Sequence, residues 1–359
     1  MASRQPITDS KIVMELIKTL VVRLVESLRL HPGLMAMFGF ASGLASYVLV
    51  EGREEFAQAI ATLMLVSWLL LVMEPWIRAL FLKIFGVKLP TMVMRFGTQM
   101  VHQESLFFAL PFFFAATTWN HAQAIFTGAL AVSALISVID PIYHGHLARR
   151  RSLYMVFHAM TLFAVLLVVL PLMLLINTEQ SLILALAIAL AFSLPSLGDV
   201  MPDGHWWRLP ATILVLVALG AVLWQVRTLI PPAALELNGI TLSQQVDREQ
   251  RSPGVSLQSI SEGELRESGL YAWTSVRAPR GLRENIHHVW IYNGEEVDRI
   301  TLDIEGRGDT GYRAWTHKLN FPNEVIGDWQ IRVLTDSGQL IGLTRFEVVP
   351  GAPSPSLAN

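Results

Sequence analysis

The sequence predicts two parts of different fold class: an α-helical membrane part of seven transmembrane helices, then an all-β immunoglobulin-like sandwich. Composition is the first observation, because 52% of the 359 residues are hydrophobic and only 16% are charged, whereas a soluble domain carries about 25% charged residues. Charge distribution is the second, since long stretches between Gly33 and Ile230 carry no charge while the segment after Pro232 has an ordinary polar composition. The third is the alternation of apolar and polar residues in that last segment, which is typical of strands.

Seven apolar runs are long enough to cross about 30 Å of hydrocarbon as helices. We expect them at Gly33–Val50, Phe56–Met73, Glu104–Thr118, Ala122–Ile139, Leu153–Ile176, Ser181–Leu197 and Leu209–Ile230. The third run is short and contains Pro111, which is tolerated where neighbouring helices cover the freed carbonyl group.

The N-terminal segment, residues 1–32, has the pattern of an amphipathic helix. Charged side chains recur near one face between Lys11 and Arg29, and leucines lie broadly opposite. This pattern predicts an interfacial helix on the cytoplasmic leaflet. The same periodicity also fits a cytosolic coiled-coil or partner helix.

Basic residues gather in alternate loops between the apolar runs. Arg78 and Lys83 follow the second run, and Arg149 to Arg151 follow the fourth, while the intervening loops carry only Arg53. Short loops rich in Lys and Arg stay in the cytoplasm. We therefore expect a cytoplasmic N-terminus, and an odd number of spans would leave the C-terminal domain on the far side of the bilayer.

The C-terminal part begins after Pro231-Pro232, because proline cannot continue a helical hydrogen-bond ladder. Residues 231–240 are predicted to form a linker, 241–349 the β-sandwich and 350–359 a disordered tail. Asn293-Gly294 supplies the positive φ that a two-residue hairpin turn needs. Strands are expected at Glu236–Val246, Gly254–Ile260, Gly269–Ala278, Asn285–Tyr292, Glu295–Ile304, Gly311–Leu319, Gly327–Thr335 and Gln339–Val348. Short strands at this spacing are typical of an immunoglobulin-like sandwich.

Three sequence blocks occur in order in this part: HVWIYNG from His288, YRAWTHK from Tyr312 and GDWQIRV from Gly327, closed by the turn at Asp336–Gly338. On these blocks the segment Thr241–Val349 resembles the β-domain family of unknown function DUF2914, although Trp273-Thr274 stands where that family has Phe-Thr. The helical part resembles a companion family of uncharacterised bacterial inner-membrane proteins. The resemblance implies the inner membrane of a Gram-negative envelope with a periplasmic β domain, and it implies no reaction.

One set of polar residues falls on the predicted cytoplasmic side of the membrane part. Its members, candidates for a metal site, are His102, Glu104, Asp140, His144, His146 and His158. Imidazoles and carboxylates are the ligands of catalytic zinc and of non-haem iron, so the set predicts, as one alternative, a metal-dependent hydrolase of lipids or small molecules. The other interpretation is that these residues lie at helix ends, where water and headgroups solvate them. Side chains two positions apart in a helix also point in different directions, so the spacings in this set do not indicate a shared metal site.

A second set of candidate residues belongs to the β domain. His288, Trp290 and Tyr292 share one strand face, and Arg313, Trp315 and His317 share another. Aromatic side chains with arginine can form a binding surface for a peptide, a glycan or a lipid headgroup. The alternative is that the tryptophans are core residues of the sandwich.

Several function classes are excluded by composition. The absence of cysteine excludes disulfides, thiolate catalysis and Cys-ligated metals, and a net charge of −2 gives no basic patch for nucleic acid. The predicted exposed domain shows no Ser–His–Asp, paired-carboxylate or Gly-rich phosphate arrangement. The favoured prediction is therefore a non-enzymatic inner-membrane protein, without a cofactor, that contacts membrane lipids and presents its β-sandwich to a periplasmic protein or glycan.

Overall fold

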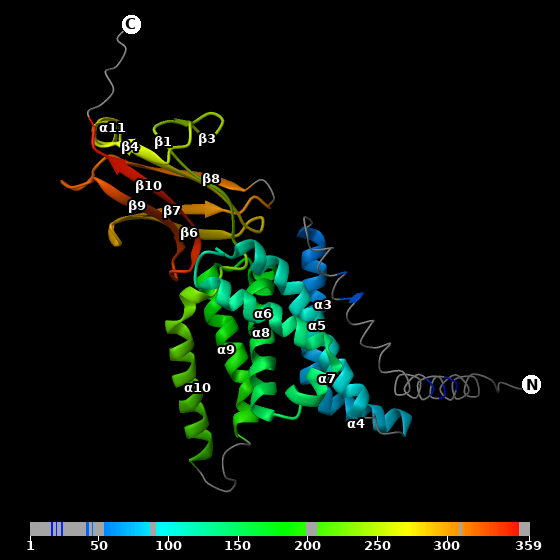
Figure 1. Cartoon of the computed structure of the whole chain (residues 1–359). Coiled ribbons are helices and arrows are strands. Elements are labelled where there is room, and N and C mark those ends of the chain that lie inside the picture. The colour runs from blue at the N-terminus through cyan, green and yellow to red at the C-terminus, as the bar shows by residue number, and fades with distance from the viewer. Residues whose placement is uncertain are drawn as a thin grey trace, which may run out of the picture.

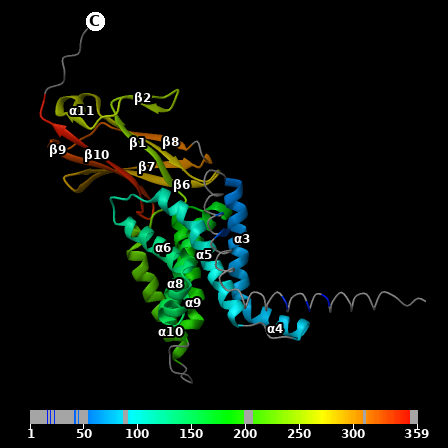
Figure 2. The same cartoon turned by 45° about the vertical axis from the view of Figure 1, so that its right-hand side comes forward.

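The computed structural model describes residues 54–86, 91–198, 207–308 and 311–351, with a few isolated positions before them. The expected amphipathic helix at 1–32, the run Gly33–Val50 and the tail from residue 352 lie outside the described residues. A helical part and a C-terminal β-sheet region stack end to end, with the β region at one end of the helices (Figures 1 and 2).

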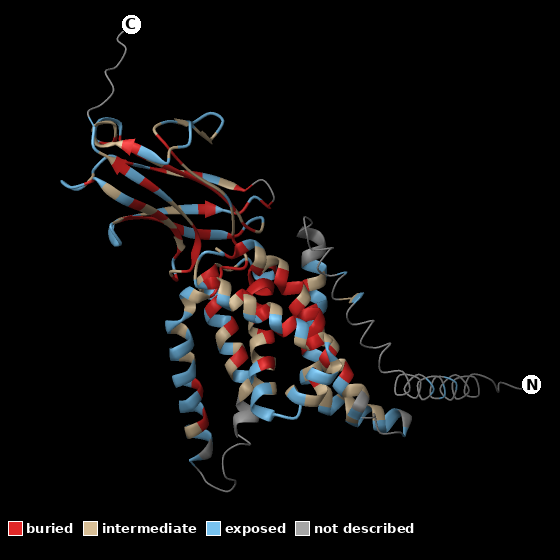
Figure 3. Ribbon diagram, in the orientation of Figure 1, coloured by how far each residue is buried: buried red, intermediate tan, exposed pale blue. Residues whose placement is uncertain are grey.

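The helical part is built around α8, which packs against α3, α5 and α9, while α10 packs against α9. Its helices are α3 (Glu54–Val72), α4 (Glu74–Phe85), α5 (Thr91–Ala116), α6 (Gln123–Val138), α7 (Asp140–Ile142), the π-helical turn η1 (Tyr143–Leu147), α8 (Arg151–Leu174), α9 (Thr178–Gly198), α10 (Arg208–Gln225) and the 3₁₀ turn η2 (Arg227–Leu229). Figure 3 shows buried residues concentrated on α5 and α8, and exposed residues along most of α10.

The prediction of seven membrane spans is wrong. Within the described residues one helix, Arg151–Leu174, is long and apolar enough to cross a membrane. The number of possible spans rises to three if each of two bent helix pairs is counted as one span. The bends, of 72° between α3 and α4 and 95° between α6 and α7, follow from Pro75 and Pro141. Proline lacks an N–H and its ring clashes with the carbonyl group four residues back, so a helix does not continue through it. It is tolerated in the first turn of a new helix, which is where Pro75 lies in α4 and Pro141 in α7.

Apolar runs overcounted the spans for two further reasons. The α5 helix has 26 residues, but Gln99, His102, Gln103 and Glu104 interrupt its apolar character. The apolar stretches of α9 and α10 are shorter than a span requires by the same length criterion. An apolar run of this kind therefore predicts a helix, but it does not by itself predict that the helix crosses a membrane.

The β region contains a five-stranded sheet, β4-β10-β9-β6-β7, a three-stranded sheet, β1-β5-β8, and the small hairpin β2-β3. Its elements are β1 (Glu236–Ser243), β2 (Val246–Asp247), β3 (Ser252–Pro253), β4 (Ser259–Ser261), α11 (Glu262–Ser268), β5 (Leu270–Arg277), β6 (Arg283–Tyr292), β7 (Glu295–Glu305), β8 (Tyr312–Lys318), β9 (Gly327–Thr335) and β10 (Leu340–Val349). One core of Trp290, Trp329 and Phe346 meets Leu242 and Leu270 of the smaller sheet.

The strands β5 to β10 lie close to their predicted positions, because alternation and the Asn293-Gly294 turn mark them. The expected strand Gly254–Ile260 is wrong, since β3 ends at Pro253 and the short β4 begins only at Ser259. The short helix α11 follows, and Ser261 caps it: Ser261 Oγ accepts from the Glu264 N–H while the Glu264 carboxylate accepts from the Ser261 N–H. This S-x-x-E capping box is a sequence signal for a helix start that the strand pattern obscured.

Hydrogen bonds fasten the β region to the helices. The β9–β10 turn and the start of β6 reach the ends of α6, α9 and η2. The bonds run from Gln123 Nε2 to Leu340 O (2.9 Å), from Arg227 Nε to Ser337 O (2.8 Å), from Gln339 Nε2 to Ile230 O (2.9 Å) and from the Thr178 N–H to Glu284 Oε2 (2.7 Å). The two parts thus share a polar, hydrogen-bonded junction.

Candidate functional site

The α5 helix carries a buried polar face in the middle of the helical part. Gln99, His102 and Gln103 are almost wholly inaccessible to solvent, as is Ser105. Residues three and four apart share a helix face, so Gln99 aligns with His102 and Gln103. Buried polar groups must find partners inside the protein, and these side chains find them on α3, α6, α7, η1 and α8.

An imidazole pair forms the centre of this polar face. His102 Nε2 lies 2.8 Å from His158 Nδ1, and His102 Nδ1 lies 2.7 Å from the Tyr143 hydroxyl. A neutral imidazole has one donor and one acceptor nitrogen. Two arrangements satisfy both bonds: either Tyr143 donates to His102 Nδ1 and His102 Nε2 donates to His158, or His158 Nδ1 donates to His102 Nε2 and His102 Nδ1 donates to Tyr143. In each arrangement the tautomer of one ring determines the tautomer of the other.

Aromatic rings enclose the imidazole pair. The Trp68 ring centroid lies 4.8 Å from that of His158 and 5.8 Å from that of His102, and Trp68 Nε1 donates to Ser105 Oγ at 2.9 Å. Tyr154 stacks on His158, with an interplanar angle of 22°. The pair is therefore held in a water-poor, ring-lined environment, where hydrogen bonds are electrostatically stronger than in water.

A second polar chain lies beside the pair. Gln99 Oε1 accepts from His144 Nε2 at 2.7 Å, and Gln99 Nε2 donates to Asp140 Oδ1 at 2.7 Å and to Ser137 O at 2.9 Å. The π-helical turn η1 makes this possible, because it directs the consecutive residues Tyr143 and His144 toward α5. Single π turns occur often at functional sites.

The predicted metal candidates converge only in pairs. His102 contacts His158, and His144 meets Asp140 through Gln99. Glu104 instead accepts from Ser42 Oγ at 2.7 Å, and His146 is exposed. In the part of the chain that the structure describes, no three His, Asp or Glu side chains form a set that could hold a metal ion. The metal-dependent hydrolase stays a prediction.

Sequence reasoning missed the residues that complete the network. Trp68, Tyr143 and Tyr154 contact the imidazoles, yet tyrosine and tryptophan are common in apolar helices and carry no signal of their own. The one usable signal was the run of Gln99, His102 and Gln103 inside an otherwise apolar helix, since polar residues there are expensive and need partners.

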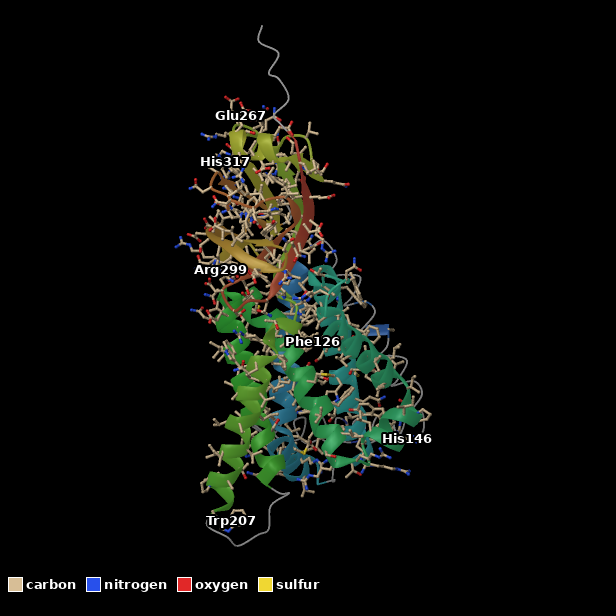
Figure 4. The ribbon with its side chains drawn as sticks, turned by 60° about the vertical axis from the view of Figure 1, so that its left-hand side comes forward. Phe126, His146, Trp207, Glu267, Arg299 and His317 are labelled. Carbon is tan, nitrogen blue, oxygen red and sulfur yellow. The ribbon has the colours of Figure 1, made fainter. Side chains whose placement is uncertain are left out.

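An apolar cavity of about 440 Å³ lies on the other side of α8, between α6, α9, α10 and η2. Its wall includes Phe126 and Phe163, whose rings meet edge to face, and Met160. Figure 4 marks Phe126 in the half of the helical part that is nearer to the β region. The cavity is within the range of about 300–1,000 Å³ that is typical of small-molecule sites. It is roughly three times the ~150 Å³ of an engineered apolar cavity that takes up benzene.

One charged side chain, Arg227, belongs to the cavity wall, which is otherwise apolar except for Ser193. Its guanidinium carbon lies 4.9 Å from the centroid of the Trp224 ring. Arg227 Nε donates to Ser337 O in the β region, and Nη1 donates to Trp224 O at 2.9 Å. Arg227 therefore belongs to the cavity and to the junction at once.

The binding-surface candidates of the β region do not lie on one face. His288 and Trp290 are fully buried between the sheets. Tyr292 is half-buried, and its hydroxyl donates to Ile326 O at 2.9 Å. Arg313, Trp315 and His317 lie on the outer face of β8. There His317 stacks on Tyr271 at 3.8 Å between centroids, and Arg251 lies 5.8 Å over Trp315.

Comparison with known proteins identifies two families of unknown function and no protein of known activity in the curated set. The family model described as "Family of unknown function (DUF5924)" matches residues 14–272, and "Protein of unknown function (DUF2914)" matches residues 283–348. No curated protein matches the chain. One similar solved structure, titled "Pseudomonas fluorescens alkylpurine DNA glycosylase AlkC bound to DNA containing an abasic site analog", is 11% identical, with a TM-score of 0.22; the match covers 82% of this chain and 97% of that one. That TM-score is too low to indicate a shared fold.

The two family matches divide the β region. The first match ends at residue 272, inside β5, and the second begins at residue 283, the first residue of β6, although β8 of the second match pairs with β5. The small sheet is therefore made from both matched segments. The segment that matches the first family needs β8 of the second segment to form its sheet.

Proposed function

We propose that this chain, which belongs to the DUF5924 family of unknown function, is a membrane protein that holds the acyl chain of a lipid in the cavity between α8, α9 and α10. The observation that carries this proposal is the cavity itself: it is large, its wall is apolar, and a single charge lies in that wall. The metal-dependent alternative has no comparable support in the geometry.

The helical part exposes an extensive apolar surface, which supports a membrane setting. Side chains on several helices point outward, among them Ile125 (71% exposed), Leu214 (70%) and Val156 (65%). A soluble monomer rarely exposes contiguous apolar patches above a few hundred Å². A bilayer would cover this surface around α8, the helix that is long and apolar enough to cross it.

The distribution of charge supports an orientation in the inner membrane. Arg149, Arg150 and Arg151 are exposed between η1 and α8, at the end of the helices away from the β region. Figure 4 marks His146 and Trp207 toward that end and His317 at the opposite one. Because short basic loops stay in the cytoplasm, the β region would face the periplasm. Its outer β8 face would there be open to a protein or glycan partner.

A lipid chain is the occupant that fits the surroundings of the cavity. Ile125 and Val156 belong to the cavity wall and to the exposed apolar surface at the same time. The medium outside the cavity would therefore be hydrocarbon. An acyl chain could enter sideways without exposing apolar surface to water, whereas a polar solute would have no path through this wall.

Filling the cavity tests the proposal. Ala159 of α8 lines it, so Ala159→Phe would place a ring in the space of the acyl chain; Leu214→Phe, on an exposed apolar position of α10 outside the cavity wall, is the matched control. Native mass spectrometry of the full chain in mild detergent should show one retained lipid in the wild type and in the control, and none in Ala159→Phe. A wild type that releases all lipid, or an Ala159→Phe variant that retains it, would refute the function.

A further inference from the structure

We infer that the bound lipid carries a phosphate and that Arg227 binds it. This inference rests on the proposed lipid site and names the chemical class of its ligand. Arg227 is the one charged residue of the cavity wall, and it lies in η2, where the helices end and the β region begins. A lipid with its chain in the cavity would have its headgroup at this end.

The hydrogen-bond donors of Arg227 are only partly used. A guanidinium has five N–H donors. One, on Nε, goes to Ser337 O and one, on Nη1, to Trp224 O, which leaves three of the five. Both acceptors are neutral carbonyls, and within the described residues no carboxylate forms an ion pair with Arg227. The positive charge therefore lacks a counter-ion among the residues that the structure describes.

The geometry around Arg227 keeps its side chain in place for a ligand. The Trp224 ring lies under the guanidinium, and the bond to Ser337 O fixes its orientation. The planar guanidinium matches the oxygens of a phosphate in a bidentate manner. Tryptophan and arginine near a helix end are also typical of the headgroup layer of a bilayer. A membrane phospholipid supplies both the chain and the phosphate.

The β region takes part in building this headgroup site. Ser337 lies in the β9–β10 turn, and Gln339 of the same turn donates to Ile230 O at 2.9 Å, next to the cavity. The turn therefore holds both Arg227 and the end of the helical part. A bound phosphate would stabilise the contact between the two parts through the guanidinium that Ser337 also engages.

Paired lipids with and without a phosphate test the inference. Delipidated full-length protein in detergent would be titrated with radiolabelled phosphatidylglycerol and with diacylglycerol of the same chains. We expect the wild type to bind phosphatidylglycerol at least about tenfold more tightly, the order expected for charge-assisted hydrogen bonds. Arg227→Gln should bind both lipids with the affinity of diacylglycerol. Arg248→Gln, an exposed arginine between β2 and β3, is the control and should bind as the wild type does.

The outcomes separate the inference from the proposed function. Equal wild-type affinity for the two lipids, or an unchanged preference in Arg227→Gln, would overturn the role of the phosphate and leave the acyl-chain site standing. Binding of neither lipid by the wild type would overturn the proposed function itself. If Arg227→Gln does not fold, the salt dependence of the wild type decides: a phosphatidylglycerol preference that declines with salt supports the inference, and one that is insensitive to salt contradicts it.

Discussion

Two histidines, one in each part of the molecule, are equally buried and differently bonded. His102 of α5 and His288 of β6 are both inaccessible to solvent, and both ring nitrogens of each have a partner. His288 meets two threonine hydroxyls of the small sheet, Thr274 at 3.1 Å and Thr316 at 3.0 Å. His102 meets Tyr143 and the imidazole of His158.

The difference shows that burial alone does not define what a histidine does. A hydroxyl can rotate to donate or to accept, so the two threonines satisfy His288 in either tautomer and the bonding ends there. An imidazole partner has no such freedom, because the proton on one ring fixes the tautomer of the other. In the β region the hydrogen bonds of His288 thus end at two neighbouring threonines, whereas in the helical part His102 is one member of a longer hydrogen-bond network.

Replacing His102 should therefore have the largest effect. His102→Ala leaves His158 Nδ1 buried without its partner, removes one of the two partners of the Tyr143 hydroxyl, which also bonds Tyr154, and opens a void. We expect a loss of about 4 kcal/mol in the free energy of unfolding. His288→Ala should cost less, because Thr274 Oγ1 also has Ala314 O within 3.5 Å. Denaturant unfolding in detergent measures both, with the exposed His146→Ala as a control that stays within about 0.5 kcal/mol of the wild type. Equal losses in the two variants would break the comparison.

The strand β6 carries a second contrast that pH should expose. Glu284 and His288 both point to the inner face of β6, and burial shifts their pKa values in opposite directions. The pKa of Glu284 is raised to about 7, chiefly by desolvation and also by the nearby carboxylates Asp336 and Glu179, against the hydrogen bonds from Thr178 that lower it. Desolvation lowers the pKa of His288 to about 4. In the folded protein Glu284 therefore keeps its proton to a higher pH than an exposed glutamate, and His288 stays neutral to a lower pH than an exposed histidine.

Stability should respond to pH with opposite signs at these two positions. Glu284 contributes stability that is present below its unfolded pKa of 4.5 and is lost as pH rises through about 7, whereas His288 contributes stability that is present above 6.5 and is lost as pH falls through about 4. Each effect is about 3 kcal/mol at full extent, and between pH 4.5 and 6.5 they oppose each other in the wild type. Glu284→Gln should therefore become more stable with rising pH in this window, and His288→Gln less stable.

Unfolding free energies measured from pH 4.5 to 7 decide this prediction, with the exposed Glu295→Gln of β7 as the control that keeps the wild-type profile. Parallel profiles for Glu284→Gln and His288→Gln would show that burial does not shift the pKa values of the two groups in opposite directions, and would remove the contrast on β6.

The β region was largely predictable from the sequence, and the helical part only in outline. Alternation along β6 and β9 places Trp290 and Trp329 on one face, and the Asn293-Gly294 turn fixes where two strands meet, so local pattern is enough. In the helical part the apolar runs predict helices, but Pro75 and Pro141 bend them into pairs, and composition does not show how a bend divides a run.

The candidate site was predictable in its members and not in its contacts. His102, His144 and His158 were identified because imidazoles with nearby carboxylates are potential metal ligands, yet the choice of partner depends on packing between helices. Tyr143 lies 41 positions from His102, and only the turn η1 brings it there. The cavity had no sequence signal, because the side chains of its wall resemble those of any buried helix face.

Tyr143→Phe sharpens the network side of the comparison with an intermediate effect. It removes one hydroxyl and leaves His102 Nδ1 without its partner, which should cost about 1–2 kcal/mol. The hydroxyl bonds both His102 and Tyr154, so the loss should be smaller, though not zero, in a His102→Ala background, which gives a coupling of about 1 kcal/mol in the double-mutant cycle. The half-buried Tyr292→Phe, whose hydroxyl bonds a carbonyl oxygen, is the control and should add to His102→Ala without coupling. Simple additivity for Tyr143→Phe would mean that the bonds are independent.

An exposed imidazole gives the smallest expected effect and completes the contrast. His317 lies on the outer face of β8, stacked on Tyr271, and His317 Nε2 is 3.0 Å from Ser268 O. Water can replace that hydrogen bond when His317 is removed, so only the ring contact is lost, and His317→Ala should cost about 0.5–1 kcal/mol. His317→Phe keeps a ring on Tyr271 and should restore most of the loss in the same unfolding assay. A loss as large as that of His288→Ala would mean that stacking on the outer face, rather than the buried hydrogen bonds between the sheets, holds β5 and β8 together.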